Sequence, residues 1–337
     1  MKKIFSMMII GIMIILPIYT VAQNTNWQIR QTFHIASSGG WDYLAIGPDN
    51  KLYVSHGTQV NILDKNNGDS LGVIENTTGV HGIAFDKTAG KGYTSNGRLN
   101  NVTVFELQSG KMITQIPAGE NPDAILFESF SKKIITCNGR SNDLSVIDPQ
   151  SGKVIATIAV GGKPETAVSD DAGMLYVNIE DKSQIVKVDL KTFSVTNHWD
   201  IAPGEEPTGL AIDKKTNRLF AGCGNAQLIV VNTIDGKVVD KLAIGDGCDG
   251  IAFDSATENI FASNGEGTLS IYHEKSASQF EKITTLPTKR GARTITTDPE
   301  THKIYLPTAE FEPQPAGDKQ RPKMKPGTFQ VLVIGQQ

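Results

Sequence analysis

The stretch LYVSHG at residues 52–57 recurs along the chain in diverged form, and this repeat decides the fold. Its seven copies are LYVSHG, GYTSNG, IITCNG, LYVNIE, LFAGCG, IFASNG and IYLPTA, anchored at Tyr53, Tyr93, Ile135, Tyr176, Phe220, Phe261 and Tyr305. Successive anchors are 40, 42, 41, 44, 41 and 44 residues apart. Self-similarity at such a period is typical of propellers and other repeat architectures.

Short apolar runs and turns surround each copy in the same order. A strand that ends in a polar turn precedes the copy, as in LAIGPDN at 44–50, and an apolar run with a turn follows it, as in VNILDKNNG at 60–68. A further outer strand completes the repeat, so each unit of about 40 residues predicts one four-stranded blade. We therefore expect an all-β fold, a seven-bladed β-propeller.

The two ends of the chain predict how the ring closes. The last repeat ends at FQVLVIG, residues 329–335, which matches the third strand of the other blades. The missing fourth strand resembles WQIRQTFHIA at residues 27–36. Because an unpaired sheet edge invites aggregation, we expect this N-terminal segment to complete the last blade. The propeller then occupies residues 23–337 and leaves no room for a second domain.

The first 22 residues have the pattern of a secretory signal peptide. Lys2 and Lys3 precede an apolar stretch at residues 4–16, and the small residues before Gln23 form a cleavage site after Ala22. The apolar stretch is shorter than a membrane-spanning helix. We expect residues 1–22 to be removed and the mature protein to be exported, periplasmic or secreted, without a membrane span.

The charge balance argues against nucleic acid as a partner. Without the two signal-peptide lysines, the chain has 30 basic and 36 acidic residues. Nucleic-acid-binding proteins instead carry a basic stripe. We expect a monomer that binds a small-molecule or protein ligand at the propeller face.

Three cysteines leave at least one thiol without an intramolecular partner. Cys137 has no candidate partner in the sequence. Cys223 and Cys248 map to the same rim of adjacent blades, so two alternatives stand: a disulfide, or two buried small apolar side chains.

The repeat motifs resemble those of the YVTN-repeat β-propeller family, also called YncE-like. The resemblance covers residues 27–335 and rests on the Tyr-Val-Thr-Asn-like strand ends, on proline turns such as Asn121-Pro122-Asp123, and on the outer hairpin VIDPQSGKVIATI at 146–158. It implies a seven-bladed propeller and an exported binding or surface protein. One branch of the family is described as binding nucleic acid.

Two rings of residues are predicted to converge on one face of the propeller. The axial ring starts the innermost strand of each blade and comprises Asp42, His81, Asp123, Glu165, Thr208, Asp249 and Arg293. The strand-end ring follows the repeated motif and comprises His56, Asn96, Asn138, Ile179, Cys223, Asn264 and Thr308. From these rings we select as candidate ligand-binding residues Asp42, His56, His81, Asn96, Asp123, Asn138, Glu165, Asp249, Asn264 and Arg293.

Each of these side chains also has a purely structural interpretation. Asp, Glu, Thr and His bond to backbone N–H groups in turns, and Asn tolerates the left-handed conformation that a corner can require. Clustered carboxylates, in contrast, call for a cation to offset them. Both interpretations stay open at this point.

Two functions follow from the rings. The first is a non-catalytic binding or interaction propeller, since the chain has no nucleophile elbow, HExxH motif or P-loop. The second is a metal-dependent lactonase or lyase. Asp249-Gly250-Ile251 resembles the strand start that carries a calcium-ligating Asp in the gluconolactonase and paraoxonase group, and Asn96, Asn138 and Asn264 resemble the Asn ligands of that group. Thr208 and Asp42 depart from its pattern.

A divalent cation is the implied cofactor of the second function. Its candidate ligands are Asp249, Asp123, Asp42 and His81. Oxygen ligands suit calcium, whereas a histidine shifts the preference toward zinc or manganese. No catalytic residue stands out from the repeats.

The last blade carries a Pro-rich insertion at residues 309–328. It contains four prolines and the basic residues Lys319, Arg321, Lys323 and Lys325. A loop of this length between adjacent strands is usually functional or disordered. We expect it to emerge on the face of the two rings and to lie over the acidic funnel.

Export makes a direct prediction. Mature protein purified from a native host should begin at or near Gln23, which N-terminal sequencing or intact mass measures. Soluble protein that retains Met1 would contradict the signal peptide.

Overall fold

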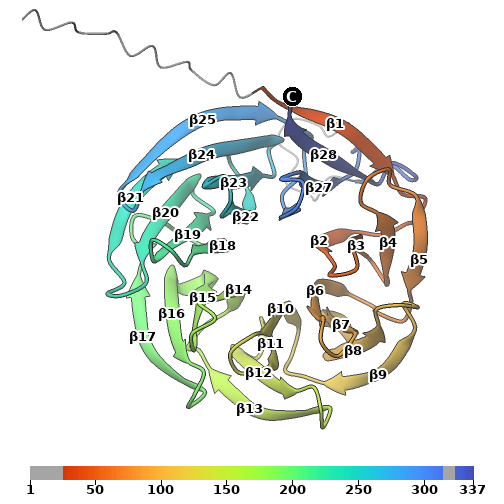
Figure 1. The fold of residues 1–337 in the computed structure, drawn as a ribbon, viewed down its shortest axis with the longest axis horizontal. Coiled ribbons are helices and arrows are strands. Elements are labelled where there is room, and N and C mark those ends of the chain that lie inside the picture. The colour runs from red at the N-terminus through yellow and green to blue at the C-terminus, as the bar shows by residue number, and fades with distance from the viewer. Residues whose placement is uncertain (1–25, 314–322) are drawn as a thin grey trace, which may run out of the picture.

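The computed structural model describes residues 26–313 and 323–337. Seven four-stranded antiparallel sheets stand in a ring around a central axis (Figure 1). The predicted signal peptide and the middle of the insertion lie outside the described residues. Within the described part of the chain, no helix has the length and apolar character needed to cross a bilayer.

In blades 1 to 6 the strands run outward from the axis in chain order, whereas blade 7 runs β26, β27, β28 and then β1 (Figure 1). The innermost strands of blades 1 to 7 are β2 (Trp41–Ile46), β6 (Val80–Asp86), β10 (Pro122–Glu128), β14 (Pro164–Ser169), β18 (Pro207–Asp213), β22 (Cys248–Asp254) and β26 (Thr296–Thr297). The second strands are β3 (Lys51–His56), β7 (Lys91–Asn96), β11 (Lys133–Asn138), β15 (Met174–Ile179), β19 (Arg218–Cys223), β23 (Asn259–Asn264) and β27 (Ile304–Thr308).

The outer half of each blade completes the sheet. The third strands are β4 (Gln59–Asp64), β8 (Asn101–Glu106), β12 (Asp143–Asp148), β16 (Gln184–Asp189), β20 (Gln227–Asn232), β24 (Thr268–Ser276) and β28 (Gln330–Gln336). The fourth strands are β5 (Ser70–Ile74), β9 (Met112–Pro117), β13 (Lys153–Ala159), β17 (Ser194–Asp200), β21 (Val238–Ala243), β25 (Gln279–Pro287) and, in blade 7, β1 (Trp27–His34). Two single 3-10 turns, η1 (Gly97–Leu99) and η2 (Glu180–Lys182), follow β7 and β15.

The repeated motif forms the second strand of every blade, as its period predicts. These strands are almost entirely buried, because both of their faces pack against neighbouring blades; Tyr53 and Phe220 are 0% exposed. The fourth strands are exposed to solvent on one side, and Leu71 and Ile155 on these strands are about half exposed. Burial therefore explains why the motif is the best preserved part of each repeat.

The hydrophobic core is divided into seven clusters, one at each interface between adjacent blades. The cluster between blades 3 and 4, for example, joins Ile135 and Leu144 to Leu175 and Val186. A single blade has no hydrophobic core of its own, because one sheet cannot bury either of its faces without a neighbouring sheet. Every blade thus depends on both neighbours.

The N-terminal strand closes the ring, which confirms the prediction from the chain ends. β1 pairs antiparallel with β28, with Trp27 opposite Gln336 and His34 opposite Gln330. Phe33 belongs to the core cluster between blades 7 and 1, and its ring lies 6.5 Å from that of Tyr305. The closing strand therefore contributes both a hydrogen-bonded ladder and part of a core.

Cys223 and Cys248 do not form a disulfide in the structure and are instead two buried, small side chains. Cys137, Cys223 and Cys248 are all buried and free. Burial raises the pKa of Cys223 to about 12, so this thiol stays protonated and behaves as a small apolar group.

The ends of the insertion form a short antiparallel ribbon. Phe311 bridges to Met324, and the Glu312 backbone N–H donates to the Lys323 carbonyl at 2.8 Å. Trp41 of blade 1 contacts Phe311, with 6.0 Å between ring centroids. Lys323 lies 3.5 Å from Glu312, so this basic group pairs within the ribbon. The predicted cover over the funnel depends on residues that the structure does not describe.

Ring closure predicts an asymmetric response to mutations in β1. Phe33→Ala removes a ring that is 4% exposed and should lower the free energy of unfolding by about 3–5 kcal/mol. Ile29→Ala on the same strand is the control, because Ile29 is 37% exposed and should change stability by less than about 1 kcal/mol. Urea unfolding measures both. Equal effects would mean that the strand adds no core to the ring.

Candidate functional site

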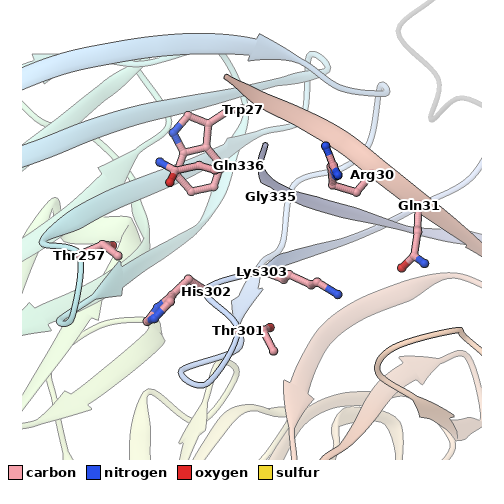
Figure 2. A pocket seen from close by; sticks show the side chains of 9 residues that line it. All are labelled: Trp27, Arg30, Gln31, Thr257, Thr301, His302, Lys303, Gly335 and Gln336. Carbon is pink, nitrogen blue, oxygen red and sulfur yellow. The ribbon is translucent and has the colours of Figure 1, made fainter. Parts of the chain in front are cut away.

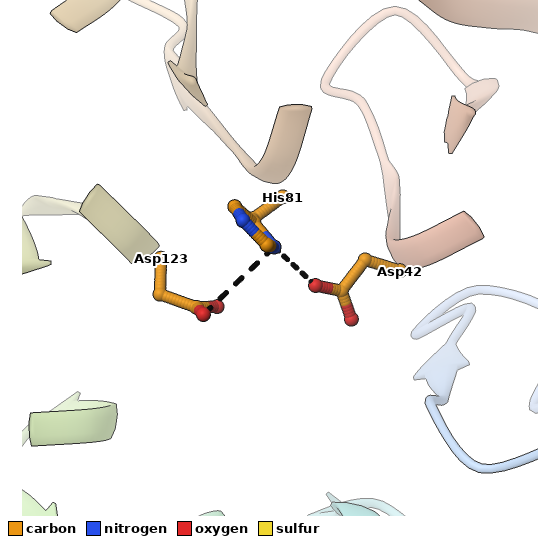
Figure 3. Close-up of side chains that lie close together, drawn as sticks. All are labelled: Asp42, His81 and Asp123. Atoms are coloured by element: carbon orange, nitrogen blue, oxygen red, sulfur yellow. Dashed lines mark hydrogen bonds and ion pairs between the residues drawn. The ribbon is translucent and has the colours of Figure 1, made fainter. Parts of the chain in front are cut away.

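The axial ring occupies one end of the propeller. In every blade, the turns from strand two to strand three, and the connections into the next blade, leave the sheet at the same end, since the strands are antiparallel. Asp42, His81 and Asp123 sit at or next to the first residues of β2, β6 and β10. Their side chains meet beside the axis (Figure 3).

His81 lies between two carboxylates from the neighbouring blades (Figure 3). Its Nδ1 is 2.5 Å from Asp42 Oδ2 and 3.8 Å from Asp123 Oδ2. One possible ligand atom from each of the three residues lies within 4.8 Å of the others. Burial would lower the pKa of His81, but the bond to Asp42 and the charge of Asp123 outweigh it and raise the pKa to about 9.

Arg293 extends this chain of charges in the other direction. Its Nε donates to Asp249 Oδ2 at 2.6 Å, and a terminal guanidinium nitrogen lies 3.6 Å from Asp42 Oδ1. Asp249, Arg293, Asp42, His81 and Asp123 therefore alternate in charge around five consecutive blades. Asp249, a candidate metal ligand from the sequence, forms an ion pair with Arg293 in the structure.

Glu165 belongs to a second group on the same ring. Lys163 Nζ donates to Glu165 Oε1 at 2.5 Å and also to Glu180. Burial, the nearby charge of Asp123 and a shared hydrogen bond with Glu180 raise the pKa of Glu165 to about 9. Sequence reasoning missed Lys163 and Glu180. Lys163 stands two residues before Glu165 in a proline turn of the same kind as Asn121-Pro122-Asp123. Glu180 comes from η2 and has no acidic counterpart in the other repeats.

Asp123 lies in an environment that disfavours its charged form. Burial and the charges of Asp42 and Asp249 raise its pKa, His81 and Lys163 oppose this rise, and the resulting pKa is about 7. Tyr43, also missed from the sequence, follows Asp42 on β2. Burial and the surrounding carboxylates raise the pKa of Tyr43 well above its usual range, so its hydroxyl stays available as a donor.

The asparagines of the strand-end ring do not join this cluster. Asn96, Asn138 and Asn264 are each 0% exposed and bond within their own blades. Asn138 Nδ2, for example, donates to Asp143 Oδ1 at 2.7 Å and to Ser145 Oγ at 2.9 Å. These bonds tie strand two to strand three, and the structure does not bring the three asparagines together with Asp42, His81 and Asp123.

The expected left-handed conformation also lies elsewhere. Asn96 is extended, with φ −121°, whereas Asn100 and Asn142, inside the following turns, have φ of 51° and 57°. The left-handed residue of each turn therefore lies four positions after the asparagine that ends strand two.

The structure places His56, Thr208, Ile179, Cys223 and Thr308 in contacts within and between the blades. His56 is 0% exposed, bonds to Ser37 and to the Gly39 carbonyl, and stacks on Phe329 with 3.8 Å between ring centroids. Burial lowers its pKa to about 4, so the imidazole is neutral. Thr208 Oγ1 donates to the Cys248 carbonyl at 2.7 Å, which links blades 5 and 6. Ile179, Cys223 and Thr308 are buried.

The geometry therefore selects a smaller site than the sequence does. Asp42, His81 and Asp123 can supply two carboxylate oxygens and one imidazole nitrogen to a cation. Glu165, Asp249 and Arg293 surround them with further charges whose own partners are already in place.

Comparison with known proteins supports the fold. A chain described as Kuenenia stuttgartiensis hydrazine synthase matches with a TM-score of 0.71 and 15% identity, over 81% of this chain and 94% of that chain. No family model and no curated protein matches the sequence. The seven-bladed propeller is thus established, while the YVTN-repeat resemblance stays a prediction from the motifs.

The crowded carboxylates predict that stability falls as pH rises. Folded Asp123 keeps its proton to about pH 7, whereas an unfolded Asp releases it near pH 4, so folding takes up a proton between these values. The contribution of His81 is complete below about pH 6.5 and is lost as pH rises through about 9. Asp123→Asn should therefore be more stable than the wild type at pH 8, by about 1–3 kcal/mol, and gain little at pH 5.

Asp148→Asn is the matched control for urea unfolding at the two pH values. The bond from Lys133 lowers the pKa of Asp148 to about 2, so this substitution should cost up to about 1 kcal/mol at pH 8. If Asp123→Asn also destabilises the protein at pH 8, Asp123 is a structural ion-pair partner.

Proposed function

We propose that this chain is an exported ligand-binding propeller and that its axial cluster binds a divalent metal ion. The observation that carries the proposal is the convergence of Asp42, His81 and Asp123 from three blades, with one ligand atom of each within 4.8 Å of the others. Charged groups that repel one another in a partly buried place lower the stability of the fold, and such groups are often found at functional sites.

The donor set indicates the class of metal. Two carboxylates and an imidazole suit zinc or manganese better than calcium, which prefers six to eight oxygens. His81 Nδ1 would have to release its proton and exchange its bond to Asp42 for a bond to the metal. Such exchange makes metal affinity rise with pH.

Export rests on the first 22 residues, and the binding role is also what the YVTN-repeat resemblance implies. Binding at the axis fits a scaffold in which several blades each contribute one side chain to a single concave site. The ligand at the propeller face is then either the metal itself or a small molecule that the metal helps to hold.

The lactonase alternative is less well supported. It gives a leading role to Asp249 and to the asparagines of the strand-end ring. Asp249 is bonded to Arg293, and the asparagines are buried within their blades. A panel of lactones, assayed with the metal-loaded protein, separates a binding protein from a hydrolase.

Thermal unfolding tests the metal site directly. After treatment with a chelator, addition of zinc or manganese to about 100 times the dissociation constant should raise the melting temperature by roughly 5 °C. His81→Gln should lose most of this shift, because it removes the imidazole ligand.

His302→Gln is the matched control. His302 Nδ1 also bonds to a carboxylate, 2.8 Å from Asp254 Oδ2, but at the other end of the propeller. This variant should keep the metal response of the wild type. A wild-type protein that responds to neither metal, or an equal loss in both variants, contradicts the axial metal site.

A further inference from the structure

A second hollow lies at the opposite end of the propeller, where the start of β1 pairs with the end of β28. It is a cavity of about 480 Å³ between blades 6 and 7 and the closing strand (Figure 2). Its lining residues are Trp27, Arg30, Gln31, Thr257, Thr301, His302, Lys303, Gly335 and Gln336. Thr257 and Thr301 belong to turns between first and second strands, which leave each sheet at the end away from the axial cluster.

The first unusual position in this cavity is Gly335. Ile304 pairs with Ile334, so Lys303 stands opposite Gly335 across the ladder. At the corresponding place the other blades carry a larger side chain: Asp64 faces Lys51, Glu106 faces Lys91, and Asp148 accepts from Lys133 at 2.9 Å. Blade 7 thus keeps the lysine but lacks the acid that faces it in blades 1 to 3.

The second unusual position is Arg30. β1 has a bulge between Ile29 and Gln31, so Arg30 is the extra residue of the strand. The bulge recurs in all the other fourth strands, where the extra residues are Leu71, Ile113, Ile155, Thr196, Val239 and Ile283. Blade 7 therefore introduces a cation at a position that is otherwise aliphatic or threonine. Bulges redirect side chains in this way.

The two departures place two cations on either side of the glycine. A Cβ built on Gly335 would lie 3.6 Å from Arg30 Cγ and 3.9 Å from Lys303 Cγ. Within the described part of the chain, neither Arg30 nor Lys303 has an ion-pair or hydrogen-bond partner for its charged group. Figure 2 shows both side chains beside the hollow, with Gly335 between their backbones.

The acidic groups next to the cavity are already bonded. Asp254 accepts from Thr257 at 2.8 Å and from His302 at 2.8 Å. Asp298 accepts from Thr301 and pairs with Lys65 at 2.9 Å. The indole N–H of Trp27, a residue 7% exposed, is buried and has no acceptor among the described residues. The side-chain carboxylates of Asp254 and Asp298 are thus paired, whereas Arg30 and Lys303 bring cations without a partner among the described residues.

We propose that this cavity is a binding site for a small organic oxyanion, a carboxylate or a phosphate ester. Arg30 offers a planar fork that binds such groups through two parallel hydrogen bonds, and Lys303 adds a point charge. Trp27 provides an apolar wall for the body of the ligand. The site is independent of the axial cluster, because it lies at the other end of the ring and shares no residue with it.

Isothermal titration calorimetry in a phosphate-free buffer at pH 7 tests the proposal with four probes. Phenyl phosphate, benzoate and inorganic phosphate are the anions, and benzylamine is the cation of similar shape. Wild-type protein should bind phenyl phosphate or benzoate and not benzylamine. The tighter of the two aromatic anions identifies the natural ligand as a phosphate ester or a carboxylate, and binding of inorganic phosphate alone contradicts a site for an organic anion.

Gly335→Asp is the decisive variant. The backbone of Gly335 is not in the left-handed region, and the added Cβ meets only ordinary contacts, so the protein should fold. The new carboxylate would face Lys303 as Asp148 faces Lys133, and it should weaken anion binding at least tenfold. Arg30→Gln, at an exposed position of β1, should produce a loss of the same order.

Lys133→Gln is the control, because it removes one positive charge at the equivalent position of blade 3. It should bind the anion as the wild type does. The proposal fails if the wild type binds no aromatic anion, if Gly335→Asp binds as tightly as the wild type, or if Lys133→Gln loses as much affinity as Arg30→Gln.

Discussion

The pairing of β1 with β28 is the contact on which the rest of the structure depends. Each of the seven hydrophobic clusters lies between two blades, so a blade without a neighbour exposes half of a core. Strand β1 carries Phe33 into the cluster between blades 7 and 1 and Trp27 into the cluster between blades 6 and 7. Closure therefore stabilises two interfaces through one strand, and an open ring loses both together.

The ring arrangement of the blades also determines which charged residues meet at the axis. Each blade brings the start of its first strand to a common centre, and a polar residue there meets its counterparts from both neighbours. Burial and neighbouring acids raise the pKa of Asp123, Glu165 and Asp249. His81 and Arg293 stand between acids of neighbouring blades, so that opposite charges alternate. Asp123 is left with a raised pKa at the end of this chain of charges.

The fold could be predicted from the sequence because the repeat period, the buried strand and the missing fourth strand all follow from local pattern. The site could be predicted only in part. The residues at the start of an inner strand must lie near the axis, which places Asp42, His81 and Asp123 together. The side chain of a strand-end asparagine can turn toward the axis or into its own blade, and only the hydroxyl and carboxylate groups across the ladder decide which. Glu180 was missed because one blade alone has it.

Departures from a repeat are more informative than the repeat itself once the fold is known. A residue shared by all blades serves what all blades need, which is packing. Gly335 and Arg30 depart from their counterparts at adjoining positions in the one blade that is built from both ends of the chain. The glycine adds no side chain to the core, and Arg30 is exposed, so neither change is required by the packing that closes the ring. Together the two changes leave two cations beside a hollow at the end of the ring away from the axial acids, and this pairing is the reason to look for an anionic ligand there.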